Sequence, residues 1–237
     1  WIIFGDDWGG HVSTTQHLAA ELARRDRVVW VNSMGMRRPR LNTRDMKRLL
    51  NKAFARGALS AEHGVEKGGV PAQIVHPRVL PWHASPPVRR FNRCLFRRQM
   101  AAAAKSLRPF DPAVLITYPV PYLYTVFPHS RLAYLKLDEY THLPGVDMDL
   151  VHLCEDQLMS DAGAIVVTAK QLIPTSASLA AKTTYLPQGV DLEHFSRVPL
   201  APPGSRVLGF FGLLAEWLDY ELVEAAAALC PDWTFEF

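Results

Sequence analysis

The ten residues L-P-Q-G-V-D-L-E-H-F, from Leu186 to Phe195, mark the place where one part of the chain ends and another begins. Pro187 closes the preceding apolar run, because proline has no N–H to donate to a sheet ladder. Gly189 accepts a positive φ without steric cost, and Asp191 can turn the chain by bonding its own backbone. A Pro-rich, stiff segment follows, and then a new apolar run over 206–211. The pattern predicts a strand exit at a junction between two domains.

Outward from this junction, apolar runs alternate with segments of helical spacing. The expected strands are 2–5, 28–32, 73–76, 113–117, 132–137, 164–168 and 183–186. One expected helix ends near residue 25, and others cover 88–108, 151–160, 170–181 and 219–229. A further helix is expected to begin at Pro119 and Pro121. Alternation of this kind favours a parallel sheet with helices on both faces. We therefore expect an α/β fold: a Rossmann-like doubly wound parallel sheet over 1–197, a linker over 198–205 and the truncated start of a second Rossmann-like domain over 206–237.

The composition is that of a globular protein, with 237 residues, 49% apolar and 21% charged. Cys94, Cys154 and Cys230 are odd in number and far apart, which favours structural thiols in a reducing cytosol over disulfides or a zinc site. No apolar run reaches the 18 residues of a membrane span. The charge is uneven, because 37–108 carries 17 Lys and Arg against three acids while the rest of the chain is net acidic.

The junction, preceded by A-I-V-V-T-A and followed by V-L-G-F-F-G, resembles the interdomain crossing of retaining glycosyltransferases with the two-domain GT-B fold. It is most similar to glycosyltransferase family 4-like bacterial enzymes of surface polysaccharide synthesis, the teichuronic-acid type among them. Their crossing reads P-N-G-V-D, and here Gln188 replaces the Asn. The resemblance implies an interdomain cleft lined by Tyr140, Gln188, Gly189, Asp191 and Gly212.

The same resemblance implies the reaction. A sugar would pass from a nucleotide-sugar donor, which is a substrate, to a membrane-associated glycan or lipid-linked acceptor, without a metal or other cofactor. A helix N-terminus and backbone N–H groups can stabilise the diphosphate leaving group instead. The donor-binding glutamates of the family are expected beyond Phe237, so we expect the 237-residue chain alone to be catalytically inactive.

A glycine-rich loop follows the first expected strand. Gly9 and Gly10 let backbone N–H groups face an anionic ligand at a helix N-terminus, although an ordinary strand–helix turn has the same composition. Ser13 and Gln16 form a possible capping box, and Gly10 is an equal candidate for the cap. A G-x-G-x-x-G nicotinamide fingerprint is absent. The family resemblance implies that Asp6, Asp7, Trp8 and His11 lie near the acceptor.

Asp138, Glu139 and Tyr140 follow the expected strand 132–137. Functional groups of open parallel sheets gather at the carboxyl ends of strands, so Asp138 and Glu139 are our candidate catalytic pair. They can orient a sugar hydroxyl or act as a base, or they can be acids at a helix N-terminus. Glycosyltransferase relatives carry a His near this strand end. We expect Gly9, Gly10, Asp138 and Gly189 to converge at one edge of the sheet.

Two basic segments, 37–56 and 88–108, have apolar residues at helical spacing. We expect amphipathic helices whose Arg89, Arg90, Arg93 and Arg97 bind an anionic membrane surface, flanked by Leu41, Leu49, Phe54 and Phe91. The alternative is a solvated cationic face. Nucleic acid is not expected as a partner, because an exposed aromatic platform is lacking. The expected location is cytoplasmic, peripheral on the inner face of the cytoplasmic membrane.

Two other functions fit the same observations. A nucleotide-sugar epimerase is built on the same paired domains, and a non-catalytic α/β module that binds membranes or polyanions would need the basic segments alone. A glutamate-containing donor site downstream of Phe237 would favour the transferase, and its absence the module.

Overall fold

The computed structural model of the protein describes residues 1–10, 12–34, 36, 69–107, 111–119, 122–126, 128–197, 204–212, 214 and 218–237. His11, the basic segment 37–56 and residues 198–203 of the expected linker lie outside the described residues. The chain divides into two compact units, Trp1–Gly189 and Val190–Phe237. This division comes before residue 197, where we expected the first domain to end.

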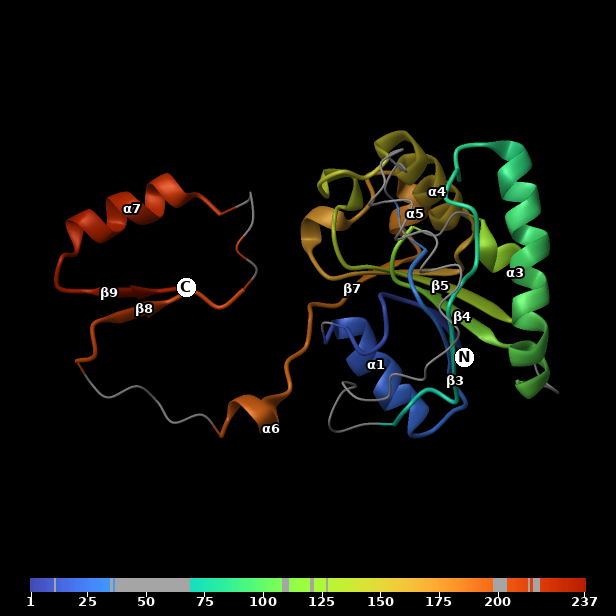
Figure 1. Cartoon of the computed structure of the whole chain (residues 1–237), viewed down its shortest axis with the longest axis horizontal. Coiled ribbons are helices and arrows are strands. Elements are labelled where there is room, and N and C mark those ends of the chain that lie inside the picture. The colour runs from blue at the N-terminus through green and yellow to red at the C-terminus, as the bar shows by residue number, and fades with distance from the viewer. Residues whose placement is uncertain are drawn as a thin grey trace. The chain divides into compact units, whose positions relative to one another are not determined.

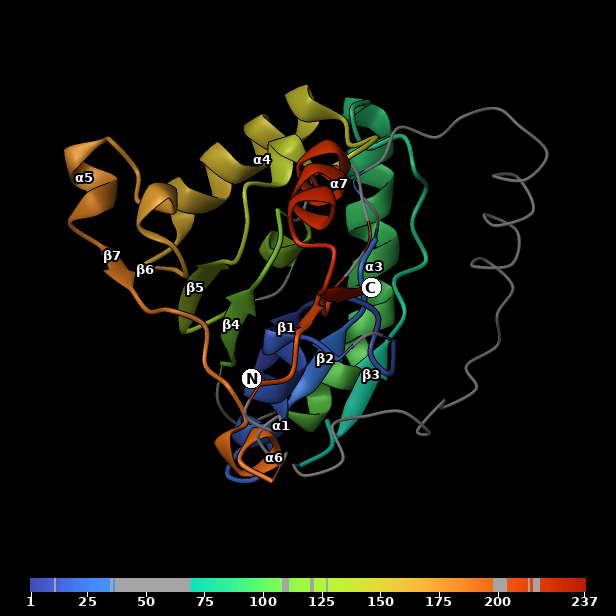
Figure 2. The same ribbon diagram turned by 90° about the vertical axis from the view of Figure 1, so that its left-hand side faces the viewer.

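The first unit is built on a seven-stranded sheet, shown in Figures 1 and 2, with the order β3-β2-β1-β4-β5-β6-β7. Its strands are β1 (Ile2–Phe4), β2 (Val29–Val31), β3 (Gln73–Val75), β4 (Ala113–Ile116), β5 (Arg131–Lys136), β6 (Ala164–Val167) and β7 (Thr183–Tyr185). Every neighbouring pair is parallel. The order reverses direction between β1 and β4, as it does in doubly wound sheets. The predicted α/β, Rossmann-like doubly wound fold is confirmed.

Helices cover both faces of this sheet. They are α1 (Thr14–Ala23), α3 (Pro86–Ser106), α4 (Met148–Asp161) and α5 (Ala177–Ala180), with the 3-10 helices η1 (Leu123–Val126), η2 (Tyr140–His142) and η3 (Lys170–Leu172). Side chains of α3, η1 and α4 pack on one face, and those of α1 on the other. Among the described helices, none is both long and apolar enough to cross a bilayer.

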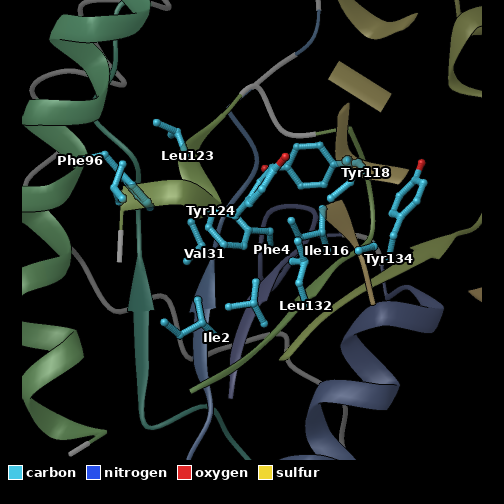
Figure 3. Packing of buried hydrophobic residues seen from close by; sticks show 14 of the residues in the cluster. Ile2, Phe4, Val31, Phe96, Ile116, Tyr118, Leu123, Tyr124, Leu132 and Tyr134 are labelled. Atoms are coloured by element: carbon cyan, nitrogen blue, oxygen red, sulfur yellow. The ribbon is translucent and has the colours of Figure 1, made fainter. Parts of the chain in front are cut away.

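The two faces follow the alternation of side chains along each strand. Ile2 and Phe4 point to the α3 side, where Phe4 meets Phe96 with ring centroids 6.1 Å apart. Figure 3 shows this packing, with Leu123 and Tyr124 of η1 among the labelled side chains. Ile3 points to the opposite face and packs in the α1 cluster. Residues buried on both faces explain why these strands read as continuous apolar runs.

Two expected helices are much shorter in the structure. The segment 170–181 contains only η3 and α5. Pro174 stands between them, and a proline disfavours helical backbone at the residue before it. The helix expected after Pro119 and Pro121 is the single 3-10 turn η1. Both predictions of a full helix are therefore wrong.

The second unit contains α6 (Leu192–Phe195), β8 (Val207–Gly209), α7 (Tyr220–Leu229) and β9 (Thr234–Glu236). The strands β8 and β9 pair in parallel. Asp219 caps α7, because its Oδ1 accepts from the N–H of Leu222 at 2.9 Å. This β-α-β order is that of a parallel sheet unit.

Candidate functional site

The polar loops of the first unit leave the sheet at one edge. Because β1, β5 and β7 run in the same direction, Gly9, Gly10, Asp138 and Gly189 all follow the carboxyl ends of their strands. Gly10 and Asp138 therefore lie at the same edge of the sheet, not at opposite ends of it. We take this edge as the candidate functional site.

Asp6 anchors the glycine-rich loop to α1. Its Oδ1 accepts from Ser13 Oγ at 3.1 Å, and its Oδ2 accepts from Gln16 Nε2 at 3.2 Å. Ser13 is also the N-cap of α1, accepting from the N–H of Gln16, so it and not Gly10 caps the helix. Burial raises the pKa of Asp6, and the hydrogen bonds from Ser13 and Gln16 oppose that rise. Both carboxylate oxygens are thus used to hold the loop.

Trp8 closes the same loop against the sheet. Its ring is buried and meets Trp30 edge-on, with centroids 4.9 Å apart at 69°. The backbone N–H of Trp8 donates to Asn32 Oδ1 at 3.1 Å, and Asn32 Nδ2 donates to His76 Nδ1 at 3.0 Å. This arrangement places the proton of a neutral His76 on Nε2. His76 is exposed, so this Nε2–H is available to a ligand at the edge.

Gly9 and Gly10 shape the tip of the loop. Gly9 has a φ of 79°, a conformation that favours glycine. The N–H of Gly10 donates to the carbonyl of Asp7 at 3.0 Å, so this amide is already used within the loop. The exposed Asp7 side chain accepts from Ser33 Oγ at 3.2 Å. Asp7 is therefore the acid of this loop that remains accessible to solvent.

Gly5 lets β1 lie close to the Trp30 ring. A Cβ on Gly5 would come 2.4 Å from two atoms of that ring, which is fully buried. We expect Gly5→Ala to lower the free energy of unfolding by about 1–3 kcal/mol, because the rigid ring must shift. Urea denaturation measures this. Gly189→Ala is the matched control, since its Cβ would meet nothing within 4 Å. Equal effects of the two substitutions would contradict this account of Gly5.

Asp138 is the exposed acid at the end of β5. Its Oδ1 accepts from the N–H of Glu139 at 2.8 Å, which fixes the carboxylate at the start of the loop. The buried Tyr140 donates its hydroxyl to the carbonyl of Thr117, joining the loops after β5 and β4. The structure thus places Asp138 on a fixed loop at the candidate site.

Glu139 makes different contacts. Its Oε2 accepts from Lys136 Nζ at 3.1 Å and its Oε1 from Thr141 Oγ1 at 2.9 Å. Burial opposes ionisation of Glu139, but the hydrogen bonds from Thr141 and Lys136 and the charge of Lys136 outweigh it and lower its pKa. A carboxylate with a lowered pKa is a weak base. Of the two candidate acids, Asp138 is the better placed for chemistry.

Lys136 and Glu155 form a buried ion pair that the sequence analysis did not find. Lys136 Nζ lies 3.0 Å from Glu155 Oε2, with side chains 8% and 5% exposed. The hydroxyl of Tyr134 donates to the other oxygen of Glu155. Burial and the charge of Glu155 keep the pKa of Tyr134 well above its usual value, so the phenol stays a donor. The pair fastens β5 to α4 beneath the Asp138 loop.

The residues of the expected interdomain cleft belong to both units. Gln188 contacts the start of α1, where its Oε1 accepts from Thr14 Oγ1 at 3.0 Å. Gly189 ends the first unit without a positive φ, so the conformational reason we gave for a glycine there is wrong. Asp191 and Gly212 are exposed residues of the second unit.

The arginines expected at a membrane surface lie on α3. Arg90, Arg93 and Arg97 are exposed, and Arg89 is half-buried. The opposite side of α3 is apolar and packs on the sheet through Phe96, Met100 and Ala103. Helix 88–108 is thus amphipathic, as predicted. Phe91, one of the apolar residues expected beside these arginines, is 54% exposed.

Across the described ranges, no three His, Cys, Asp or Glu side chains gather closely enough to hold a metal ion. In comparisons with known proteins, no family model matches the chain and no curated protein matches it significantly. The site is therefore interpreted from its own geometry.

Proposed function

We propose that the protein is a glycosyltransferase of the GT-B type, which transfers a sugar from a nucleotide-sugar donor to a membrane-associated glycan or lipid-linked acceptor. The observation that carries this proposal is the exposed Asp138 on a fixed loop, at the carboxyl edge of a seven-stranded parallel sheet. Ligands of such sheets bind at this edge.

The neighbours of Asp138 support a polar substrate. Exposed Asp7 and the exposed Nε2–H of His76 belong to loops at the same edge, where they offer an acceptor and a donor for sugar hydroxyls. The second unit begins another parallel β-α-β arrangement, and we assign the nucleotide-sugar to it. In this proposal Asp138 orients or deprotonates the acceptor hydroxyl, while Glu139 and Lys136 hold its loop in place.

The charge of α3 supports attachment to a membrane. Arg90, Arg93 and Arg97 are exposed on one helix, with Phe91 beside them. Cationic side chains with flanking apolar groups bind anionic lipid surfaces. We propose peripheral attachment at the inner face of the cytoplasmic membrane, which would bring a lipid-linked acceptor to the enzyme.

The test is sugar transfer by protein expressed from its complete coding sequence. A panel of nucleotide-sugars is supplied with lipid-linked acceptors in phosphatidylglycerol vesicles, and product is measured by mass spectrometry. We expect Asp138→Asn to lower kcat by at least about 100-fold, since loss of a general base costs that much. Asp111→Asn is the matched control, because Asp111 is an exposed acid before β4, at the opposite edge of the sheet.

Other outcomes of this experiment would change the assigned function or the role of Asp138. Interconversion of sugar epimers without transfer would establish an epimerase instead. Vesicle binding without any turnover would leave the non-catalytic module. Transfer that survives Asp138→Asn at the rate of the Asp111→Asn control would remove Asp138 from the mechanism.

A further inference from the structure

A groove of about 630 Å³ lies between α3, η1 and α4, outside the candidate site. Figures 1 and 2 show α3 and α4 on the same side of the sheet. The main residues that line the groove are Arg89, Arg90, Arg93, Tyr122, Tyr124 and Leu153. The groove thus combines three cationic side chains with aromatic and aliphatic ones.

The arginines of this groove have no acidic partner in the described part of the chain. Asp161 also lines the groove, but its oxygens accept from Tyr124 Oη and Gln157 Nε2, each at 2.8 Å. Arg89 is half-buried, and its charge opposes the burial that raises the pKa of Cys154 to about 11. Arg89 and Cys154 both line the groove, and a negative ligand there would neutralise the half-buried guanidinium.

Tyr122 forms a wall of the groove in a strained conformation. Its φ is 58°, and it is the non-glycine residue with a positive φ in the described ranges. Its hydroxyl accepts from Asn92 Nδ2 at 3.0 Å and lies 3.2 Å from His83 Nδ1. The guanidinium of Arg93 lies over its ring, 5.3 Å from the centroid. Strain that several contacts maintain is found at ligand sites, and the cation–π contact keeps the Arg93 guanidinium at the groove, beside the Tyr122 ring.

We propose that this groove binds the phosphate of an anionic phospholipid headgroup. Guanidinium groups match phosphate oxygens in charge and in fork geometry, and three of them suit a doubly charged phosphomonoester. A lipid source is favoured over free phosphate because Leu153, 57% exposed, lies at the groove and Phe91, 54% exposed, is next to Arg90 on α3. These apolar side chains would contact the glycerol and the first acyl carbons. The inference gives the proposed membrane attachment a specific lipid site and rests on that attachment, but it does not depend on the proposed transferase activity.

Calorimetric titration of the whole chain with dihexanoyl phosphatidic acid, below its micelle concentration, tests this. We expect saturable binding that weakens as salt is raised, and at least about tenfold weaker binding by the Arg89→Gln/Arg90→Gln variant. Arg98→Gln is the matched control, since Arg98 is exposed on the same helix but does not line the groove. Far-ultraviolet circular dichroism and thermal denaturation confirm that all variants fold.

Two further titrations distinguish the sources of the phosphate. Dihexanoyl phosphatidylcholine, which has no net charge, should not bind. Inorganic phosphate should bind at least about tenfold more weakly than the lipid, and equal affinities would overturn the lipid source. If Arg98→Gln weakens phosphatidic acid binding as much as the double variant does, the groove is not the site. In sedimentation with phosphatidic acid vesicles, the double variant should pellet less than Arg98→Gln, and the reverse order would also overturn the proposal.

Discussion

Replacing Lys136 by Met is expected to lower the free energy of unfolding by about 3–5 kcal/mol, because it leaves the buried Glu155 carboxylate without its cation. Lys136 and Glu155 are 3.0 Å apart and almost fully buried, and the Tyr134 hydroxyl satisfies only one oxygen of Glu155. Glu139 would lose the same cation. The measurement is urea denaturation at pH 7, followed by tryptophan fluorescence.

The exposed pair Arg24 and Glu21 provides the matched control. Its atoms are also 3.0 Å apart, but the side chains are 49% and 58% exposed. Arg24→Met should cost less than about 1 kcal/mol, because water screens the pair. The double variant Lys136→Met/Glu155→Leu should be more stable than Lys136→Met alone, since the unpaired charge is gone. If Lys136→Met costs no more than Arg24→Met, the buried pair does not hold β5 to α4.

The central strands β1 and β2 could be predicted closely, because their residues are buried on both faces. Ile2–Phe4 and Val29–Val31 are continuous apolar runs that end at Gly5 and Asn32, which sequence periodicity detects directly. The segment 170–181 was harder to assign. Its helical spacing is interrupted by Pro174, and the local backbone preference of proline outweighed the periodicity.

The candidate site was predictable only in part. Asp138 follows an apolar run directly, so its place at the sheet edge follows from local sequence. The hydrogen-bond partners of Asn32 and Lys136 do not follow from local sequence, because His76 and Glu155 are 44 and 19 residues away along the chain. Lys136 is the last residue of β5 and directly follows the apolar run 132–135, and a lone lysine there is the signal that would have suggested a buried acid opposite it.

Acidification is expected to destabilise the protein through His83. This ring is 3% exposed, and burial lowers its pKa from 6.5 to about 4. Between these two values the unfolded chain binds a proton that the folded chain does not. The stability contributed by neutral His83 is therefore complete above pH 6.5 and is lost as the pH falls towards 4. Between pH 7 and pH 5 the loss should be about 2 kcal/mol.

The contacts of His83 indicate a variant that isolates this effect. Tyr122 Oη accepts from Asn92 Nδ2, so its own proton can be donated to His83 Nδ1, and protonation of the ring at Nδ1 would remove that acceptor. His83→Asn places an amide oxygen near the same point and cannot titrate. The acid-induced loss of unfolding free energy should be about 2 kcal/mol smaller in this variant than in the wild type, while contributions from other groups, such as the raised pKa of Asp6, cancel in the comparison. His152→Asn, which changes an exposed histidine on α4, should retain the full wild-type loss. A loss that is the same in all three proteins would show that the buried ring does not govern the acid sensitivity.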